Sequence, residues 1–250
     1  MTVNTVAQRS STVQSAFILP EAQRFLEFQV KKRKQIKLKE QKNSYIQGRE
    51  EHDAEPIKKI EDILAISQYY IDNEKYRDNL LFITGINTGL RQSDLRRLRL
   101  CDVMNEDMTE KTDIAVRELK TNKVRHIAIN DAIKKALGLY LKNVDVKPDD
   151  FLFRSNSNNG KNENKPIERY SIQRILQSAV RHIGLDIRCG THTMRKTFGY
   201  QFMKQNEKNP RALHFLMDLF NHSSEAITLR YIGINKEEKQ QAYLSLNLGG

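Results

Sequence analysis

Two residues of the segment THTMRKTFGYQF could bind an anion together. His192 and Arg195 are three positions apart, so on a helix their side chains share one face. Met194, Phe198 and Phe202 recur every four residues on another face and are predicted to pack in the core. Taken alone, an H-x-x-R spacing is more often a pair of exposed side chains than a binding site. The segment therefore supports an anion-binding site only if other candidate residues in the chain point to the same chemistry.

A histidine and a tyrosine stand at a fixed interval in NHSSEAITLRYIGI. His222 precedes Tyr231 by nine positions, with a serine-rich turn and one or two turns of helix predicted between them. A phenol can act as a nucleophile when a neighbouring group removes its proton, and histidine is the commonest such group. The alternative is that Tyr231 packs against Ile227, four residues earlier on an amphipathic helix. These residues alone leave both explanations open.

Arg91, in TGLRQSDLRRLR, is a candidate anion ligand between two predicted helices. Gly89 suits the left-handed position at the end of the first helix, and Ser93 is predicted as the N-cap of the second. A guanidinium placed there would act beside the free N–H groups of a helix N-terminus, which attract anions. Asp94 either orients Arg91 or is an ordinary acidic residue of a first helical turn.

Two lysines accompany the turn of a predicted β-hairpin. The segments DIAVREL and VRHIAIN are short and rich in β-branched residues, and Ile127 and Ile129 alternate with other residues as in a half-buried strand. Lys120 is predicted at the end of the first strand and Lys123 in the turn TNK. Such a turn can project a lysine into a groove, although charged hairpin turns are also common without any such role.

Helices are predicted to position these segments. Ile57, Ile60, Leu64 and Ile71 recur at helical spacing and predict an amphipathic helix that buries them. Ser171 is predicted as the N-cap of a later helix. Further helices are predicted over residues 78–88, 93–100, 131–141, 171–184, 191–206, 211–220 and 224–232. The sum is a mainly α-helical fold with a small antiparallel β-sheet.

The composition favours a polyanionic partner. The 250 residues include 42 Lys and Arg against 31 Asp and Glu, a formal net charge of +11. Since neutralising phosphates releases counterions, this excess favours nucleic-acid binding, although ordinary solubility also explains it and a membrane surface is a weaker alternative. No apolar run reaches the roughly 20 residues of a membrane span, and the N-terminus does not read as a signal peptide. Two cysteines without a CxxC pair, Cys101 and Cys189, fit a reduced cytosolic protein without a thiolate metal site.

The charge distribution suggests two parts. Residues 22–48 carry eight Lys or Arg and two Glu, a local balance of 8 − 2 = +6, and are predicted to form a basic helix. Its cluster could contact a phosphate backbone, or it could be a solvated helix face; the cluster is Lys31, Lys32, Arg33 and Lys34. The acidic stretch GREEHDAEP reads as a linker, so we expect a short N-terminal segment, 1–55, and a main domain, 56–250.

The order of the candidate groups along the chain changes the interpretation of each motif. They are Arg91, Lys120, His192, Arg195, His222 and Tyr231. From about residue 56 to 235 the chain resembles the catalytic domain of the tyrosine recombinase, or phage-type integrase, family. TGLRQSDLRRLRLCDV is similar to the first arginine box, HTMRKTF to the H-x-x-R box, and FNHSSEAITLRYIGI to the box that ends in the nucleophilic tyrosine. The resemblance implies the α+β fold of that domain, with a short helical N-terminal segment.

The chain departs from the family pattern at three points. Asn221 replaces the glycine usual before the third-box histidine, and we expect it to alter the turn that places His222. Lys196 follows Arg195 where the family often has histidine. The part before residue 56 is shorter than the core-binding domain of many members, so this is either a compact member or one whose N-terminal domain is reduced or truncated.

The resemblance implies DNA strand cleavage by transesterification. Tyr231 would be the nucleophile, and because a free phenol has a pKa of about 10, it needs a base, for which His192 is the candidate. His222 would donate a hydrogen bond to a phosphate oxygen. The product would be a 3′-phosphotyrosyl link that a second strand's 5′ hydroxyl can attack, so rejoining would need no ATP and no cofactor.

The cationic residues have matching roles under the same resemblance. Arg91 and Arg195 would clamp the phosphodiester, since guanidinium groups neutralise and orient its oxygens through paired hydrogen bonds. Lys120 would protonate the leaving 5′ oxygen, with Lys123 as the fallback. These cations would make a metal ion unnecessary. Lys123 and the basic cluster of the N-terminal segment are also the tentative contacts to the DNA backbone.

The resemblance further implies double-stranded DNA as partner and a homo-tetramer on paired sites, in the cytoplasm, for a protein of bacterial or phage origin. Tyr243, Leu244 and Leu246 could anchor a C-terminal segment exchanged between protomers, or pack within their own chain. The expected activity is integration, excision or inversion of a mobile element. Two alternatives are a non-cleaving architectural DNA-binding protein of the same fold and a topoisomerase-like enzyme that relaxes supercoils without a specific site.

Overall fold

The computed structural model describes residues 54–120, 122–155 and 164–246, with backbone only at residues 235–239 and 242. The chain separates into two units, Met1–Ser44 and Tyr45–Gly250, and every described residue belongs to the second. The predicted basic helix and its cluster Lys31–Lys34 lie outside the described residues and stay predictions, as does the division of the chain at residue 55.

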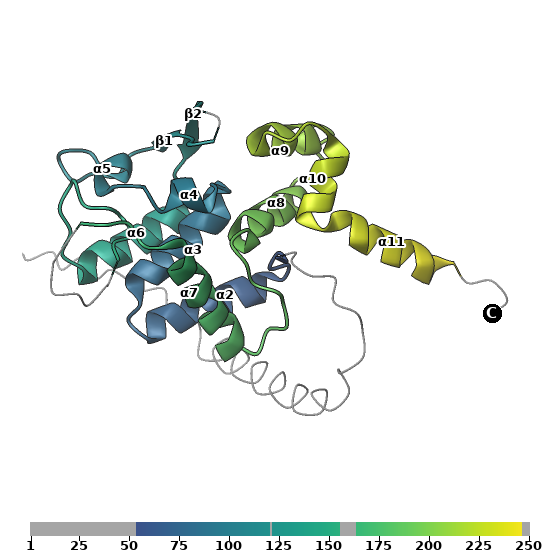
Figure 1. The fold of residues 1–250 in the computed structure, drawn as a ribbon, viewed down its shortest axis with the longest axis horizontal. Coiled ribbons are helices and arrows are strands. Elements are labelled where there is room, and N and C mark those ends of the chain that lie inside the picture. The colour runs from purple at the N-terminus through teal and green to yellow at the C-terminus, as the bar shows by residue number, and fades with distance from the viewer. Residues whose placement is uncertain (1–53, 121, 156–163, 247–250) are drawn as a thin grey trace, which may run out of the picture. The chain divides into compact units, whose positions relative to one another are not determined.

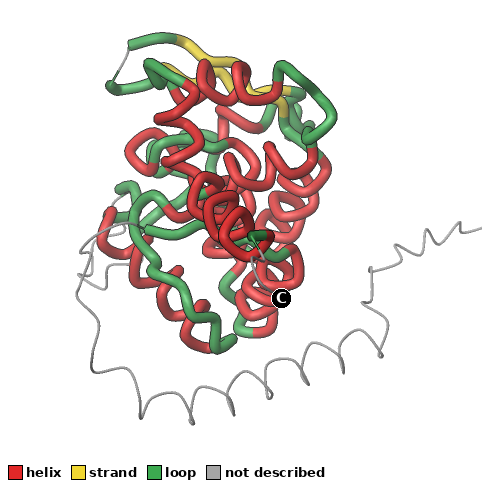
Figure 2. The backbone as a smooth tube through the Cα atoms, turned by 90° about the vertical axis from the view of Figure 1, so that its right-hand side faces the viewer, coloured by secondary structure: helices red, strands yellow, loops and turns green. Residues whose placement is uncertain are grey.

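Helices make up most of the described chain, and one hairpin forms its sheet (Figures 1 and 2). The helices are α2 (Ile60–Asp72), α3 (Tyr76–Thr88), α4 (Gln92–Leu95), α5 (Leu100–Val103), α6 (Asp131–Asn143), α7 (Arg169–His182), α8 (Thr193–Gln205), α9 (Ala212–Phe220), α10 (Glu225–Ile232) and α11 (Ile234–Ser245). The strands are β1 (Asp113–Arg117) and β2 (Val124–Ala128), paired antiparallel. The predicted fold class is confirmed. No described helix is long and apolar enough to cross a bilayer.

Helix α3 is the centre of the larger hydrophobic core, which we call the main core. Its residues are buried on several sides, including Leu80, Leu81 and Phe82, as expected of a helix covered all round. It packs against α2, α6 and α8. It ends at Gly89, whose φ of 59° is the left-handed C-cap predicted from the sequence. A Cβ there would lie 2.4 Å from the Phe198 ring, so glycine also lets α8 approach the end of α3.

Helix α2 does not bury the face that the spacing of its aliphatic residues predicted to be buried. Ile60 and Leu64 are 46% and 52% exposed, whereas Ile66 and Tyr70 are buried. Two apolar stripes share this helix, and the one that carries the large aromatic ring of Tyr70 is the one that packs. The prediction for Ile60 and Leu64 was therefore wrong, because helical periodicity does not say which of two stripes finds a partner.

The hairpin forms as predicted, with Ile114 opposite Ile127 and both side chains buried. Strand β1 ends at Arg117, so Lys120 lies in the turn and not at the strand end as predicted. Two predicted caps were also wrong. Ser93 and Ser171 each lie inside a helix, because α4 begins after Arg91 and α7 after Glu168. Neither Arg91 nor Glu168 caps its helix with its side chain, so a search for capping residue types could not find these starts.

The last helices have a small apolar cluster of their own, which we call the C-terminal cluster. Its buried residues are Leu216, Phe220 and Ile232 from α9 and α10. The predicted core residues Phe198 and Phe202 are half-buried against it. Figure 1 shows α11 running away from these helices beyond Gly233, where the backbone turns at a φ of 82°.

Candidate active site

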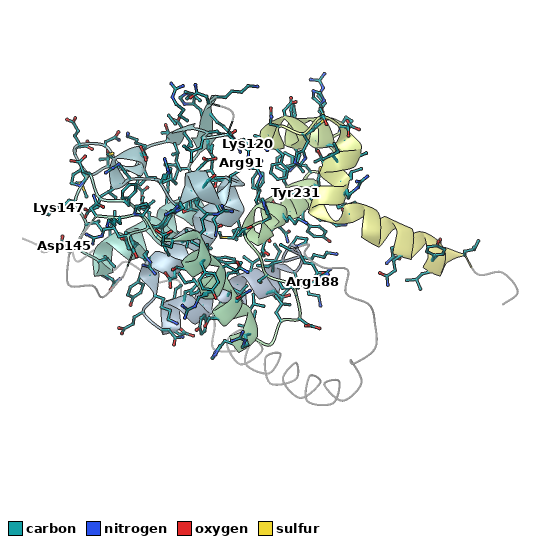
Figure 3. All side chains as sticks on the ribbon, in the orientation of Figure 1. Arg91, Lys120, Asp145, Lys147, Arg188 and Tyr231 are labelled. Atoms are coloured by element: carbon teal, nitrogen blue, oxygen red, sulfur yellow. The ribbon has the colours of Figure 1, made fainter. Side chains whose placement is uncertain are left out.

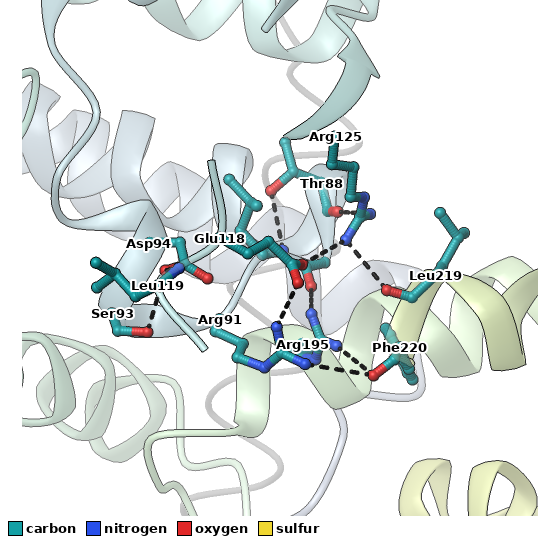
Figure 4. Close-up of polar contacts among 12 residues, drawn as sticks. Thr88, Arg91, Ser93, Asp94, Glu118, Leu119, Arg125, Arg195, Leu219 and Phe220 are labelled. Atoms are coloured by element: carbon teal, nitrogen blue, oxygen red, sulfur yellow. Dashed lines mark hydrogen bonds and ion pairs between the residues drawn. The ribbon is translucent and has the colours of Figure 1, made fainter. Parts of the chain in front are cut away.

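Two guanidinium groups converge where α9 ends. Arg91 immediately precedes α4, and Arg195 projects from the buried face of α8. Both donate to the backbone carbonyl of Phe220, at Nη2–O distances of 3.5 Å for Arg91 and 3.3 Å for Arg195 (Figure 4). Arg195 also donates through Nη1 to the carbonyl of Gly89, just beyond α3. The ends of α3 and α9 thus fix both groups, and the partial negative charge of helix C-termini favours cations there.

A carboxylate and a third arginine, which the sequence analysis missed, complete this cluster. Glu118 accepts from Arg91 at 2.7 Å, and its other oxygen lies 3.7 Å from Arg125. Arg125 donates to the carbonyls of Thr88 and Leu219, at 2.9 and 3.2 Å. Strand alternation was the signal that could have found them. Glu118 lies on the face of β1 that buries Ile114, and Arg125 on the face of β2 that buries Ile127.

The cluster keeps a surplus of positive charge, since its three guanidiniums outnumber the two carboxylates that act on it, Glu118 and Asp94. Burial lowers the pKa of Arg195 to about 10, and burial also lowers the pKa of Arg125. Arg195 nevertheless remains protonated at neutral pH. A further anion entering beside Arg91 and Arg195 would therefore be attracted electrostatically, and the low polarisability around a buried group strengthens that attraction.

The phenol of Tyr231 lies beside this cluster with a histidine on its oxygen. The Tyr231 hydroxyl and His192 Nδ1 are 3.0 Å apart, and His192 immediately precedes α8. The ring of Phe220, whose carbonyl receives both arginines, packs edge-on against the Tyr231 ring with centroids 5.4 Å apart. One residue therefore links the arginine cluster to the phenol through its carbonyl and its side chain.

His222 packs edge-on against the rings of Phe220 and Tyr231. Its centroid is 5.2 Å from that of Tyr231, and its Nδ1 is 3.1 Å from the hydroxyl of buried Thr228. Burial lowers the pKa of His222, and the positive charges of Arg195 and Arg91 lower it further. The neutral imidazole is consequently favoured near neutral pH. The contact with Thr228 occupies Nδ1, so Nε2 is the nitrogen left for a ligand.

Asn221 forms the turn that positions His222. Its φ and ψ of 53° and 49° are left-handed, a conformation that glycine adopts freely and that asparagine tolerates best among other residues. The backbone N–H of His222 then donates to the carbonyl of Met217 at 3.0 Å, which closes the end of α9. Asparagine therefore supplies the left-handed conformation that this position requires, and the expected alteration of the turn stays a prediction.

Lys120 lies exposed in the hairpin turn, and the residues before it tie that turn to Arg91. Glu118 pairs with Arg91, and the N–H of Leu119 donates to Asp94 Oδ1 at 3.1 Å (Figure 4). Asp94 therefore holds the hairpin backbone, while Glu118 is the carboxylate on Arg91. Figure 3 shows Lys120, Arg91 and Tyr231 in one region of the view. Lys123 is exposed at the other end of the turn.

Residues 56–238 match the phage integrase family. The chain belongs to this family. Its members include tyrosine-type site-specific recombinases, and the enzyme class predicted from the motifs is confirmed. The site described above is thus a candidate integrase-family active site. Within the described ranges no group of three His, Cys, Asp or Glu side chains could hold a metal ion.

The chain is similar to two curated relatives and, in fold, to two solved structures. A probable integrase/recombinase of Bacillus subtilis, YoeC, is 40% identical over 192 residues, which are 77% of this chain and 96% of YoeC. The tyrosine recombinase XerA of Pyrococcus furiosus is 26% identical over 71% of this chain and 57% of its own length. A crystal structure of XerA recombinase has a TM-score of 0.56, with 21% identity over 89% of this chain and 80% of that one. A XerH structure has a TM-score of 0.55, with 16% identity over 76% and 52%.

The structure brings together five of the six candidate residues through direct contacts or shared neighbours. These are Arg91, His192, Arg195, His222 and Tyr231. The sixth, Lys120, is tied to them through the backbone of its turn. Their assigned roles stay predictions, because proximity shows which groups can act together and not which step each performs.

Proposed function

We propose that this integrase-family enzyme cuts DNA through attack of Tyr231 on a phosphodiester and rejoins it through the reverse reaction. The observation that supports this most is the phenol oxygen 3.0 Å from His192, beside two guanidiniums joined at the Phe220 carbonyl. In the forward step the phenol oxygen bonds to phosphorus and the bond from phosphorus to the 5′ oxygen breaks. A 3′-phosphotyrosyl link and a free 5′ hydroxyl result.

Arg91 and Arg195 are proposed to hold the two non-bridging oxygens of the reacting phosphate. Charge builds on these oxygens in the transition state, so fixed cations lower its energy more than that of the ground state. Each guanidinium carries five N–H donors, and the protein carbonyls and Glu118 engage only some of those of Arg91. The remaining donors are available to a phosphate without dismantling the cluster.

Proton transfers are assigned by the atoms that the side chains present. His192 Nδ1 would accept the phenol proton, since it already lies at hydrogen-bonding distance. His222 would donate from Nε2 to a phosphate oxygen, while its Nδ1 accepts a hydrogen bond from the Thr228 hydroxyl. Lys120, in the turn anchored to Arg91, would give a proton to the leaving 5′ oxygen, with Lys123 as the fallback.

The proposal extends to the DNA complex and the assembly. One XerH structure is described as bound to a palindromic difH substrate in a post-cleavage complex, which shows that the fold is compatible with DNA cleavage in that protein. We propose that the protein acts as a homo-tetramer on paired DNA sites in the cytoplasm. The reaction would integrate, excise or invert a mobile element. Exposed Tyr243, Leu244 and Leu246 at the end of α11 support exchange of this helix between protomers. Residues 1–55 would form a separate short DNA-contacting segment.

Mapping a covalent adduct on half-site DNA tests the reaction. A substrate nicked near its cleavage site traps the intermediate, and mass spectrometry of the digested protein is expected to find the nucleotide on Tyr231. Tyr231→Phe should abolish the adduct and leave DNA binding within about 2-fold, whereas Tyr243→Phe, at an exposed tyrosine, serves as the matched control. Arg91→Ala and Arg195→Ala should slow adduct formation by about 10²–10³-fold.

Three outcomes would contradict the proposal. Tight, site-selective binding by the wild-type chain with no adduct would instead support a non-cleaving architectural protein. Relaxation of supercoiled plasmids that lack any recombination site would support a topoisomerase-like cycle. An adduct on any tyrosine other than Tyr231 would refute the assignment of the nucleophile.

A further inference from the structure

Lys196 is a buried lysine directly against the nucleophile. It follows Arg195 on α8 and is 4% exposed. Its backbone N–H donates to the carbonyl of His192 at 2.8 Å, so the two residues are one helical turn apart on the same face. Its Nζ lies 5.2 Å from the centroid of the Tyr231 ring. His192 and Lys196 therefore contact the same tyrosine, one at its hydroxyl and the other at its ring.

Electron-rich neighbours stabilise a buried ammonium, and the Tyr231 ring is one such neighbour of Lys196. Lysine is among the residues least often buried, because removing its charge from water is costly. The face of an aromatic ring is electron-rich and attracts a cation within about 6 Å of its centroid. When the phenol loses its proton, the ring and oxygen carry a full negative charge, so the attraction to Lys196 becomes stronger than in the neutral state.

Other charged and titratable groups around Tyr231 are already accounted for by other contacts. Arg195 and Arg91 are bound to the Phe220 carbonyl, and the pKa of His222 is lowered by burial and by these arginines. His192 contacts the phenol oxygen. The described charged groups of α10 itself are exposed, at Glu225 and Arg230. Among the described residues, Lys196 places its ammonium over the Tyr231 ring.

We propose that Lys196 is a positioning residue for the nucleophile, which orients the Tyr231 ring and favours transfer of the phenol proton to His192. This inference rests on the proposed function, since it concerns how Tyr231 becomes reactive. It explains why the position after Arg195 carries a long cationic side chain although it is buried. The ammonium stabilises the anionic form of the nucleophile, whereas the arginine cluster stabilises the phosphate.

The test is the pH dependence of single-turnover cleavage by Lys196→Met and Lys196→Arg. Methionine keeps the length and apolar stem without the charge, and arginine keeps the charge. We expect Lys196→Met to lose about 10-fold in rate at pH 7, to recover as the pH rises, and to show its midpoint about 1 pH unit higher. Lys196→Arg should keep the wild-type midpoint. A rate lowered equally at every pH, with the midpoint unmoved, would show that Lys196 only packs.

Two further measurements test the role of Lys196: rescue of the Lys196→Met rate with a more acidic phenol, and direct titration of the Tyr231 phenol. Replacing Tyr231 with a fluorinated tyrosine, whose phenol is more acidic, should restore the rate of Lys196→Met at pH 7, which a packing defect would not allow. If Lys196→Met fails to fold, the difference in phenolate absorbance between wild type and Tyr231→Phe serves instead. The phenolate absorbance of Tyr231 should appear with a midpoint below about pH 10, since a free phenol has a pKa of about 10. A midpoint at or above about 10 would overturn the inference.

These results separate the inference from the function on which it rests. If the wild-type chain forms no adduct at Tyr231, the proposed function fails. If the adduct forms at Tyr231 and neither the Lys196→Met midpoint nor the phenolate absorbance is displaced, only the role of Lys196 fails.

Discussion

The two halves of the candidate site stand on hydrophobic cores of very different size. Arg91 and the hairpin turn of Lys120 are attached to the main core, which extends from Ile57 to Met194. Tyr231 and His222 are attached to the C-terminal cluster, whose fully buried residues come from α9 and α10 alone. Helix α8 reaches both, since Met194 belongs to the main core and Phe198 packs on the C-terminal cluster.

The difference in core size predicts that the half of the site on the main core is rigid and that the half on the C-terminal cluster is more mobile. We call these the rigid half and the nucleophile half. Elements with few buried contacts open locally at lower free energy than the global core. The rigid half should therefore be preformed, while the nucleophile half can adjust around it. Hydrogen bonds that join the halves include Arg91 with Phe220, Arg195 with Gly89 and Arg125 with Leu219.

The largest effect should come from the lysine of the rigid half. Lys120→Ala is expected to slow cleavage by about 10³-fold, because the 5′ oxygen then leaves without a proton donor. A substrate with sulfur in place of the bridging 5′ oxygen should restore the rate, since a thiolate leaves unprotonated. Single-turnover cleavage of both substrates measures this. Lys123→Ala is the control, and an equal rescue of that variant would move the general acid to Lys123.

The carboxylate of the arginine cluster should matter mainly for stability. Glu118→Gln removes one charge from a buried pair with Arg91, which is expected to lower the free energy of unfolding by about 3 kcal/mol. Urea denaturation measures this. Glu168→Gln is the matched control, because Glu168 is exposed, pairs with Arg96 at 3.4 Å, and should cost less than about 0.5 kcal/mol. Equal losses for both variants would mean that the buried cluster does not anchor the rigid half.

A smaller, local effect should distinguish the two cores directly. Ile232→Val deletes one methylene from the C-terminal cluster and should lower the opening free energy of α10 amides by about 1 kcal/mol, leaving the α3 amides unchanged. Ile66→Val, equally buried in the main core, should affect α3 instead. Native-state hydrogen exchange reads both elements. If either variant shifts α3 and α10 alike, the two cores unfold as one unit and the proposed division is wrong.

The smallest effect should be a pH dependence in the nucleophile half. Because the folded protein lowers the pKa of His222, the unfolded chain binds the proton more readily. The stability that the neutral His222 contributes to the folded protein is fully present above the unfolded pKa of about 6.5, and it is lost as the pH falls below that value. His222→Gln should therefore reduce the difference in thermal midpoint between pH 7.5 and pH 5.5. His214→Gln, at an exposed histidine, is the control, and the same change in both variants would contradict the assignment.

Motifs could be predicted from sequence where local chemistry fixes the backbone. Gly89 ends α3 in the left-handed conformation, and the alternation of Ile127 and Ile129 gives a strand of the hairpin. The interval from His222 to Tyr231 holds because a serine-capped helix, beginning after Ser224, spans it. Local rules failed at Ser93 and Ser171, which have the residue type of a cap without its position.

Long-range contacts could not be predicted in this way. Glu118 has no motif of its own, and it becomes the partner of Arg91 only because the hairpin packs against the start of α4, 27 positions away in sequence. The same holds for Arg125 on the carbonyls of Thr88 and Leu219. A residue type predicts what a side chain can bind, whereas its partner depends on where the chain returns in space.

By itself, the sequence determined the family and the mainly helical class and predicted a set of reactive side chains, because the short-range order of residue types governs helices, turns and motif spacing. Only the tertiary structure decided which stripe of α2 is buried, which carboxylate holds Arg91, and that Lys196 lies over the Tyr231 ring. These depend on packing between segments far apart in the chain, where the burial of large side chains and the need to satisfy buried charges select one arrangement among several that local pattern allows.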